Sequence, residues 1–232
     1  MTKKGFLEVY NDCVQDYKDR GVWVEVSRQE IDDWKAQGLP IHFIAHHCVL
    51  NDGSKSTPVR VVLDSTLKNN YQGPSLNDVL CKGPNGLSNL FDVMMRWRSY
   101  PVAMVFDLSK AYHQIMCHDL EKMTRLVVWR DGDTSKPFKV YGNTRVGMGD
   151  RPAVNALELG TDKAAEVGEH IDPPAAEKLK KDRFADDVLT GGDKAMVLRM
   201  RGKAFKKDDG TIVLMEQSQR SWKWFPSRQR AS

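Results

Sequence analysis

The sequence has few cysteines and no long apolar segment. Its four cysteines lie far apart and form no Cys-x-x-Cys pair, which argues against a disulfide framework (Cys13, Cys48, Cys81 and Cys117). No run approaches the ~20 apolar residues of a membrane span, and no apolar stretch follows the N-terminal Met-Thr-Lys-Lys-Gly-Phe to make a secretion signal. These absences predict an intracellular protein of the cytoplasm or nucleus, with no membrane partner.

Charge of one sign does not dominate, although the chain is mildly basic. A net charge of +4 and a pI near 8.8 suit a polyanionic partner without requiring one. From Arg199 onward, nine Lys and Arg residues oppose three acids. Such a segment either pairs with phosphates or is a solvated terminus, and the sequence leaves both readings open.

The periodicity of apolar residues predicts helices and short strands that alternate without a βαβ rhythm. Helices are expected at 7–20, 27–38, 88–99, 150–170, 175–181 and 193–205, and strands at 41–50, 59–65, 102–108, 124–129, 138–144, 184–189 and 212–215. Ser27 and Glu30 should form a capping box. Asp150 should cap the long helix, with Pro152 in its first turn. The fold class expected from this order is α+β with antiparallel sheet.

Three aspartates stand where strands leave the core. The run 102–108 is nearly all apolar, which predicts a strand buried on both faces that ends at Asp107. Asp186 and Asp187 lie at the tip of a hairpin between two apolar halves, where their repulsion is unfavourable unless a cation offsets it. Mg²⁺ takes carboxylate oxygens and keeps positions open for phosphate. A pair of acids in a turn is common, so its surroundings decide its meaning.

Those surroundings resemble a known family. The segment from Asp107 to Ile115, an acid followed by Tyr112 and then by Gln-Ile, resembles the first catalytic motif of reverse transcriptases. Phe184-Ala185-Asp186-Asp187 resembles their Tyr-x-Asp-Asp box. Gly147 and Pro152 are five residues apart, as at the start of the template-contacting helix. The Arg60–Asp64 strand and the Ser75–Asp78 segment resemble parts of the fingers.

The order of further short motifs is similar to the polymerase of BEL/Pao-type LTR retrotransposons. These motifs are His46-His47-Cys48-Val49, Gly83-Pro84, Leu90-Phe91-Asp92, Arg96-Trp97-Arg98, Asp187–Gly192 and Trp222–Ser227. The resemblance extends from about residue 40 to residue 227. It implies a polymerase-like palm with a fingers subdomain and no thumb. The segments expected are an N-terminal helical part (1–40), fingers-like parts (41–84 and 117–146), palm parts (85–116 and 147–215) and a basic tail (216–232).

The resemblance also implies roles for single residues. Asp107, Asp186 and Asp187, with the backbone carbonyl of Leu108, would hold two Mg²⁺ ions, with Mn²⁺ as a substitute. Arg60, assisted by Lys55, would bind the incoming dNTP through its phosphates. Tyr112 would lie under the sugar and exclude a 2′-hydroxyl, whereas Gly147 and Pro152 would contact the template. The partners implied are an RNA or DNA template, a primer and other parts of the retrotransposon polyprotein.

Several positions depart from the family pattern. Val146, Pro58, the Asp150-Arg151 pair and Phe184 each replace a residue that is usual there, which together indicates drift in a decaying element. Only 45 residues follow Asp187 (232 − 187), too few for a thumb or RNase H domain. The chain is therefore expected to be a fragment, a truncated gene product or a domesticated remnant.

Other functions remain to be weighed against a polymerase. A catalytically silent remnant would at most bind nucleic acid or another protein, and a nuclease would need the acids without the nucleotide pocket. Arg60 could be a plain surface residue and Tyr112 a core aromatic. Zinc is disfavoured, because neither candidate group has a second pair at zinc-finger spacing (His113, Cys117 and His118; His46, His47 and Cys48).

Overall fold

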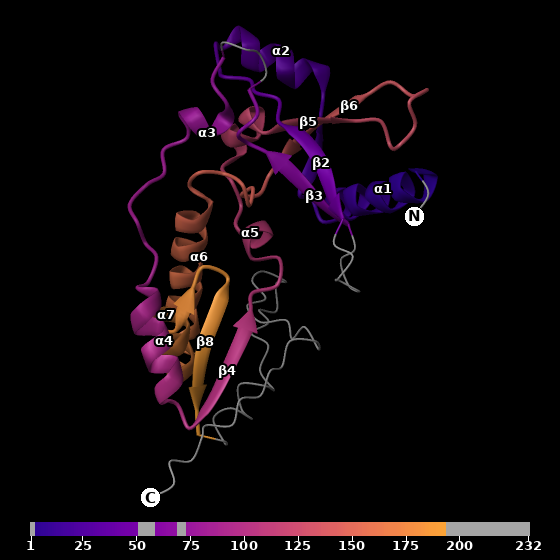
Figure 1. Ribbon diagram of the computed structural model, residues 1–232. Coiled ribbons are helices and arrows are strands. Elements are labelled where there is room, and N and C mark those ends of the chain that lie inside the picture. Colours follow the sequence, from indigo (N-terminus) through magenta and orange to yellow (C-terminus); the bar gives the residue numbers. More distant parts are fainter. Residues whose placement is uncertain (1–2, 51–58, 69–72, 194–232) are drawn as a thin grey trace, which may run out of the picture. The chain divides into compact units, whose positions relative to one another are not determined.

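The computed structural model describes residues 3–50, 59–68 and 73–193, which form an α+β fold (Figure 1). All pairings between its named strands are antiparallel, as the sequence predicts. The chain divides into two compact units. Unit 1 comprises 1–82 and 115–153, and unit 2 comprises 83–114 and 154–232. No helix among the described residues combines the length and apolar character needed to cross a membrane.

Unit 1 holds two small sheets packed with a long helix. Its elements are α1 (Lys3–Asp19), β1 (Trp23–Val26), α2 (Arg28–Ala36), β2 (Ala45–Leu50), β3 (Val59–Asp64), α3 (Leu76–Val79), the 3₁₀ helix η1 (Asp119–Thr124), β5 (Leu126–Trp129) and β6 (Lys139–Asn143). The strand orders are β1-β6-β5 and β2-β3. Tyr10 and Val14 of α1 pack with Trp23, Val59 and Val127 in one apolar core, which joins the helix to both sheets.

Unit 2 is built around a three-stranded sheet in the order β4-β8-β7. Its elements are α4 (Leu90–Ser99), β4 (Val102–Asp107), α5 (Ala111–Gln114), α6 (Ala153–Gly168), α7 (Pro173–Lys181), β7 (Arg183–Phe184) and β8 (Asp187–Gly192). The helix α6 begins at the last residue of unit 1. The strands β4 and β8 pair along their full length, from Val102 opposite Gly192 to Asp107 opposite Asp187.

The structure corrects two local predictions. The strand β4 is not buried on both faces: Met104 is 5% exposed, whereas Val105 is 37% exposed and Asp107 is exposed. An apolar run alone does not distinguish one covered face from two, because a short strand can expose an occasional large apolar residue. Asp150 does not cap α6 with its side chain. Its carboxylate instead accepts hydrogen bonds from Ser65, Arg125 and the backbone N–H of Gly147.

Other local predictions are confirmed or lie outside the described residues. The capping box at α2 is present, with Ser27 and Glu30 bonded reciprocally. The short strand β1 was not predicted, because four residues between two helices carry little periodic signal. The expected helix at 193–205, strand at 212–215 and basic tail lie wholly or almost wholly outside the described residues.

Candidate functional site

The hairpin of β7 and β8 brings two of the three aspartates face to face across the sheet. Asp187 is the first residue of β8 and lies directly opposite Asp107, the last residue of β4. Directly opposed residues project from the same face of an antiparallel sheet, with Cα atoms about 4.5–5.5 Å apart. Both side chains are exposed, so the two carboxylates share an accessible face.

Asp186 lies in the two-residue turn that joins β7 to β8. The preceding residue, Ala185, has a φ of +53°, a backbone conformation that type II′ hairpin turns place at this position. The carbonyl oxygen of Asp186 accepts a hydrogen bond from the N–H of Leu108 (2.9 Å). This bond ties the turn to the residue that follows Asp107, which holds the tip of the hairpin beside the end of β4.

The face of the sheet that carries Asp107 and Asp187, called the acidic face below, is electrostatically unfavourable for a second negative charge. The pKa of the Asp187 carboxyl is raised above its ordinary value, chiefly by partial burial and then by the charges of Asp186 and Asp107. Each of these causes penalises the ionised form of Asp187. A bound cation would reverse the penalty, because it would favour the charged carboxylate and neutralise the neighbouring acids.

The donor set at this face consists of hard oxygens. No group of three acid, histidine or cysteine side chains within the described ranges forms a ready-made metal cluster. The opposed pair Asp107–Asp187, with Asp186 adjacent, nevertheless offers the carboxylate oxygens that Mg²⁺ prefers. The carbonyl of Leu108 accepts one hydrogen bond from Ala111 (3.1 Å), which leaves its second lone pair for another contact. These donor atoms are of the kind that Mg²⁺ takes.

Tyr112 lies near the acidic turn. It is part of the short helix α5 and is 9% exposed. Burial raises the pKa of its hydroxyl, and the charges of Asp186 and Glu158 raise it further. Because the charge of Asp186 acts on this hydroxyl oxygen, Tyr112 lies within electrostatic range of the turn that carries Asp186. Its burial is also what a core aromatic would show, so both readings of this residue stay open.

The residues expected to bind phosphates and template belong to unit 1. Arg60 is exposed on β3, where it lies opposite Val49 of β2. Lys55 lies outside the described residues. Pro152 directly precedes the first residue of α6 and is half-buried. Asp107, Asp187 and Tyr112 belong to unit 2.

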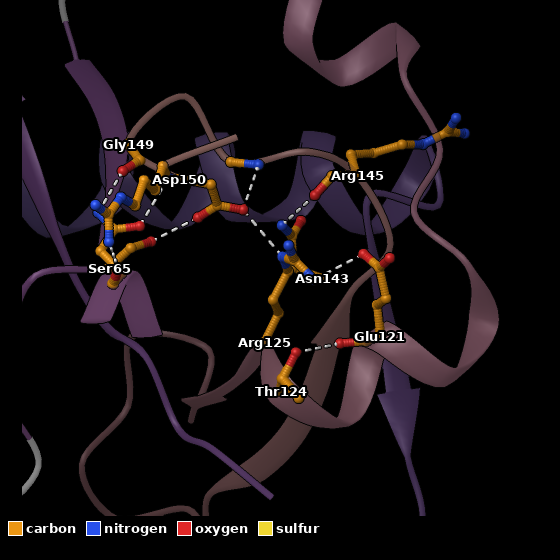
Figure 2. A network of polar contacts seen from close by, with 11 residues as sticks. Ser65, Glu121, Thr124, Arg125, Asn143, Arg145, Gly149 and Asp150 are labelled. Atoms are coloured by element: carbon orange, nitrogen blue, oxygen red, sulfur yellow. Dashed lines mark hydrogen bonds and ion pairs between the residues drawn. The ribbon is translucent and has the colours of Figure 1, made fainter. Parts of the chain in front are cut away.

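Gly147 is held in a turn by a buried network around Asp150 (Figure 2). One oxygen of Asp150 accepts from the Ser65 hydroxyl (2.6 Å), and the other accepts from Nε of Arg125 (3.0 Å) and the N–H of Gly147 (3.2 Å). A Cβ added at Gly147 would lie 2.9 Å from Oδ1 of Asp150. Internal packing therefore explains glycine at this position without any template.

The network also reaches the segment after β3. Asn77 donates to the carbonyl of Gly149 (2.8 Å) and accepts from the N–H of Arg151 (2.7 Å). Arg125 pairs in addition with Glu121 (3.0 Å). Asp150 and Arg151, which depart from the family pattern, are thus bonded into their surroundings.

Two histidines and one cysteine of the groups considered for zinc are poorly suited to bind it. Nδ1 of His46 accepts from the Tyr10 hydroxyl, and its Nε2–H donates to the carbonyl of Val128 (3.0 Å). His118 accepts from the N–H of Leu120 at the start of η1 (3.2 Å). Burial raises the pKa of the Cys117 thiol to about 11, which disfavours the thiolate that zinc requires. These contacts give zinc no support.

Sequence reasoning missed the buried ion pairs that support these positions. Arg125 pairs with Asp150 in unit 1, and Arg183 pairs with Glu158 in unit 2; each pair joins residues 25 apart. The only available signal was a charged residue next to a buried strand, which does not identify its partner. No protein-family model matches the sequence, and a search of curated proteins finds no match.

Proposed function

We propose that the chain is a fingers–palm part of an RNA-directed DNA polymerase of the retrotransposon type. The observation that carries the proposal is the register of β4 and β8, in which Asp107 lies opposite Asp187 and the turn residue Asp186 is bonded to Leu108. Tyr112 near Asp186 supports it further. The motifs around these residues, in their order along the chain, supply the family resemblance.

The residues would divide the work of nucleotidyl transfer. Mg²⁺ bound by Asp107, Asp186 and Asp187 would stabilise the attacking 3′-hydroxyl oxygen and the departing pyrophosphate. Leu108 would add its carbonyl oxygen to the same site.

Further residues would hold the substrates. Tyr112 would pack beneath the deoxyribose and disfavour a 2′-hydroxyl, whereas the exposed guanidinium of Arg60 offers a fork for phosphate oxygens. The turn at Gly147 and Pro152 would contact the template.

Primer extension tests this function. The full chain is incubated with Mg²⁺ or Mn²⁺, a DNA primer on an RNA template, and one labelled dNTP. The wild type should incorporate the nucleotide, and Asp186→Asn should reduce incorporation by at least ~100-fold, because it removes a carboxylate from the metal site. Asp12→Asn, which changes an exposed acid of α1, is the matched control and should retain activity.

The outcomes separate the candidate functions. Extension that survives Asp186→Asn would contradict the proposed site. Salt-dependent binding of an RNA–DNA hybrid without incorporation by the wild type would favour a silent nucleic-acid-binding remnant. Metal-dependent cleavage of the template without incorporation would favour a nuclease.

A further inference from the structure

Two buried charged residues lie at the start of the hairpin that carries Asp186 and Asp187: Asp182 directly precedes β7, and Arg183 is its first residue. Asp182 is 1% exposed and Arg183 is 2% exposed. Asp and Arg are almost never fully buried unless they are paired, because removing their charge from water is costly. The contacts that balance these two charges therefore decide where the start of the hairpin lies.

Asp182 is held by α4, α7 and β8. Its carboxylate accepts from the Tyr100 hydroxyl (2.6 Å), from Thr190 Oγ1 (2.8 Å) and from Nε of Arg96 (3.2 Å). Nζ of Lys178 lies 3.8 Å from the same carboxylate. Arg96 also donates to the carbonyl of Lys181, the last residue of α7. The backbone oxygen of Asp182 accepts from the N–H of Leu189 (2.6 Å), so the residue is bonded to β8 through both backbone and side chain.

Arg183 is held by α6 and α7. Its Nε and Nη2 both donate to Oε2 of Glu158 (2.7 and 2.5 Å), and Nη2 lies 2.8 Å from Asp162. The guanidinium also donates to the carbonyl oxygens of Glu158 (3.2 Å) and Leu179 (3.3 Å). Arg183 lies opposite the fully buried Val188, so its side chain projects from the buried face of the sheet, away from the face of Asp187.

These contacts matter because the β7 half of the hairpin is too short to fix its own position. The strand β8 is fixed by its six-residue pairing with β4, but β7 has only two residues, so its pairing with β8 contributes little to holding the first half of the hairpin. We propose that Asp182 and Arg183 are positioning residues, a clamp that holds the acid-bearing turn at the end of β4. The metal-binding consequence rests on the proposed function, whereas the clamping itself does not. No metal contact is assigned to either residue.

The clamp is tested first without metal, by amide hydrogen exchange of the full chain. Arg183→Lys keeps the charge but loses the planar fork that reaches two carboxylates and two carbonyls. We expect exchange at the Leu108 and Leu189 amides to rise at least ~10-fold, because these amides donate to the carbonyls of Asp186 and Asp182. Amides of the β1–β6 ladder in unit 1 should be unchanged.

A matched control breaks a different ion pair of α6. Lys163→Ala removes the exposed contact between Lys163 and Glu166 and should leave exchange at Leu108 unchanged. If Arg183→Lys does not fold, Arg96→Lys tests the other side of the clamp, since the Arg96 side chain is 40% exposed. Its expected effect is faster exchange at Leu189. Wild-type exchange at the reporting amides in the folded variant would overturn the clamp.

Mn²⁺ titration, followed by the electron paramagnetic resonance of the free ion, tests whether the clamp positions the acids. Arg183→Lys should bind Mn²⁺ about tenfold more weakly than the wild type, as expected when support of the ligands is lost. Faster exchange with unchanged Mn²⁺ affinity would overturn the positioning role. Faster exchange in a chain whose wild type binds no Mn²⁺ would uphold the clamp and overturn the proposed function instead.

Discussion

Ala185, which directly precedes Asp186 and Asp187, has a backbone conformation that residues other than glycine rarely adopt. Its φ of +53° costs an L-residue about 1–2 kcal/mol relative to glycine. Such a residue persists only where its surroundings determine it. Here the surroundings are the hydrogen bond from Leu108 to Asp186 and the paired strands on either side. The turn thus keeps Asp186 and Asp187 in place at the expense of local strain.

Ala185→Gly should therefore stabilise unit 2 by about 0.5–1 kcal/mol. Relief of the strain outweighs the entropy that glycine adds to the unfolded chain, roughly 0.4–1 kcal/mol. The measurement is urea unfolding. Ala156→Gly in the interior of α6 is the control and should destabilise by about 1 kcal/mol. If both substitutions destabilise the protein equally, the turn is not strained.

At the scale of elements, the turn from Gly147 to Asp150 depends on one carboxylate. Asp150 bonds to Ser65, Arg125 and Gly147, which come from the end of β3, the start of β5 and the turn itself. A buried charge that loses its partner is strongly destabilising, whereas a pair replaced as a whole can be nearly neutral. The network thus fixes the shape of this turn, and the effects of substituting its members on stability should be coupled.

Asp150→Asn should destabilise unit 1 by about 3 kcal/mol, because it leaves the buried Arg125 with Glu121 alone. Arg125→Met should cost a similar amount, and the double variant should cost clearly less than the sum. A double-mutant cycle from urea unfolding measures this coupling. Lys139→Ala, which breaks an exposed pair with Glu25, should change little. Additive effects of Asp150→Asn and Arg125→Met would contradict the network.

Local elements could be predicted from the sequence where a local signal exists. The capping box at Ser27 and the Asp186 turn are examples, because each depends on neighbours within four residues. The ion pairs Arg125–Asp150 and Arg183–Glu158 could not be predicted, since the partners lie 25 residues apart in each pair and periodicity does not name them. The same limit explains why β4 was expected to be buried on both faces.

At the scale of the whole molecule, each unit is made from two separate stretches of chain. The sequence left open whether residues 1–40 fold with the segments that follow. Tyr10, Val14 and Trp23 answer this, because they form one core with Val59 and Val127 of the later strands. Such a core arises from long-range apolar contacts that one sequence does not reveal. The subdomain boundaries expected from the family resemblance differ from those of the two units and stay a prediction.

The acidic face affects the whole molecule, because it makes the stability of the fold depend on pH and on bound metal. Folding raises the pKa of Asp187 above its ordinary value of 3.8. Below that value the carboxyl is protonated in both states and carries no penalty. Between that value and the raised pKa, the unfolded chain ionises while the folded chain still holds its proton, so stability falls as pH rises and levels off above the raised pKa. Above the raised pKa the metal-free protein carries the full penalty, which a bound cation would remove.

Calorimetric unfolding at pH 7, with and without Mg²⁺, tests the central claim that these acids form a metal site. We predict that Mg²⁺ at ~100 times its Kd stabilises the wild type by about 2.7 kcal/mol. Asp187→Asn should unfold at a higher temperature than the wild type without metal and should lose the response to Mg²⁺. An equal response of both proteins to Mg²⁺, or no response of the wild type, would contradict the account.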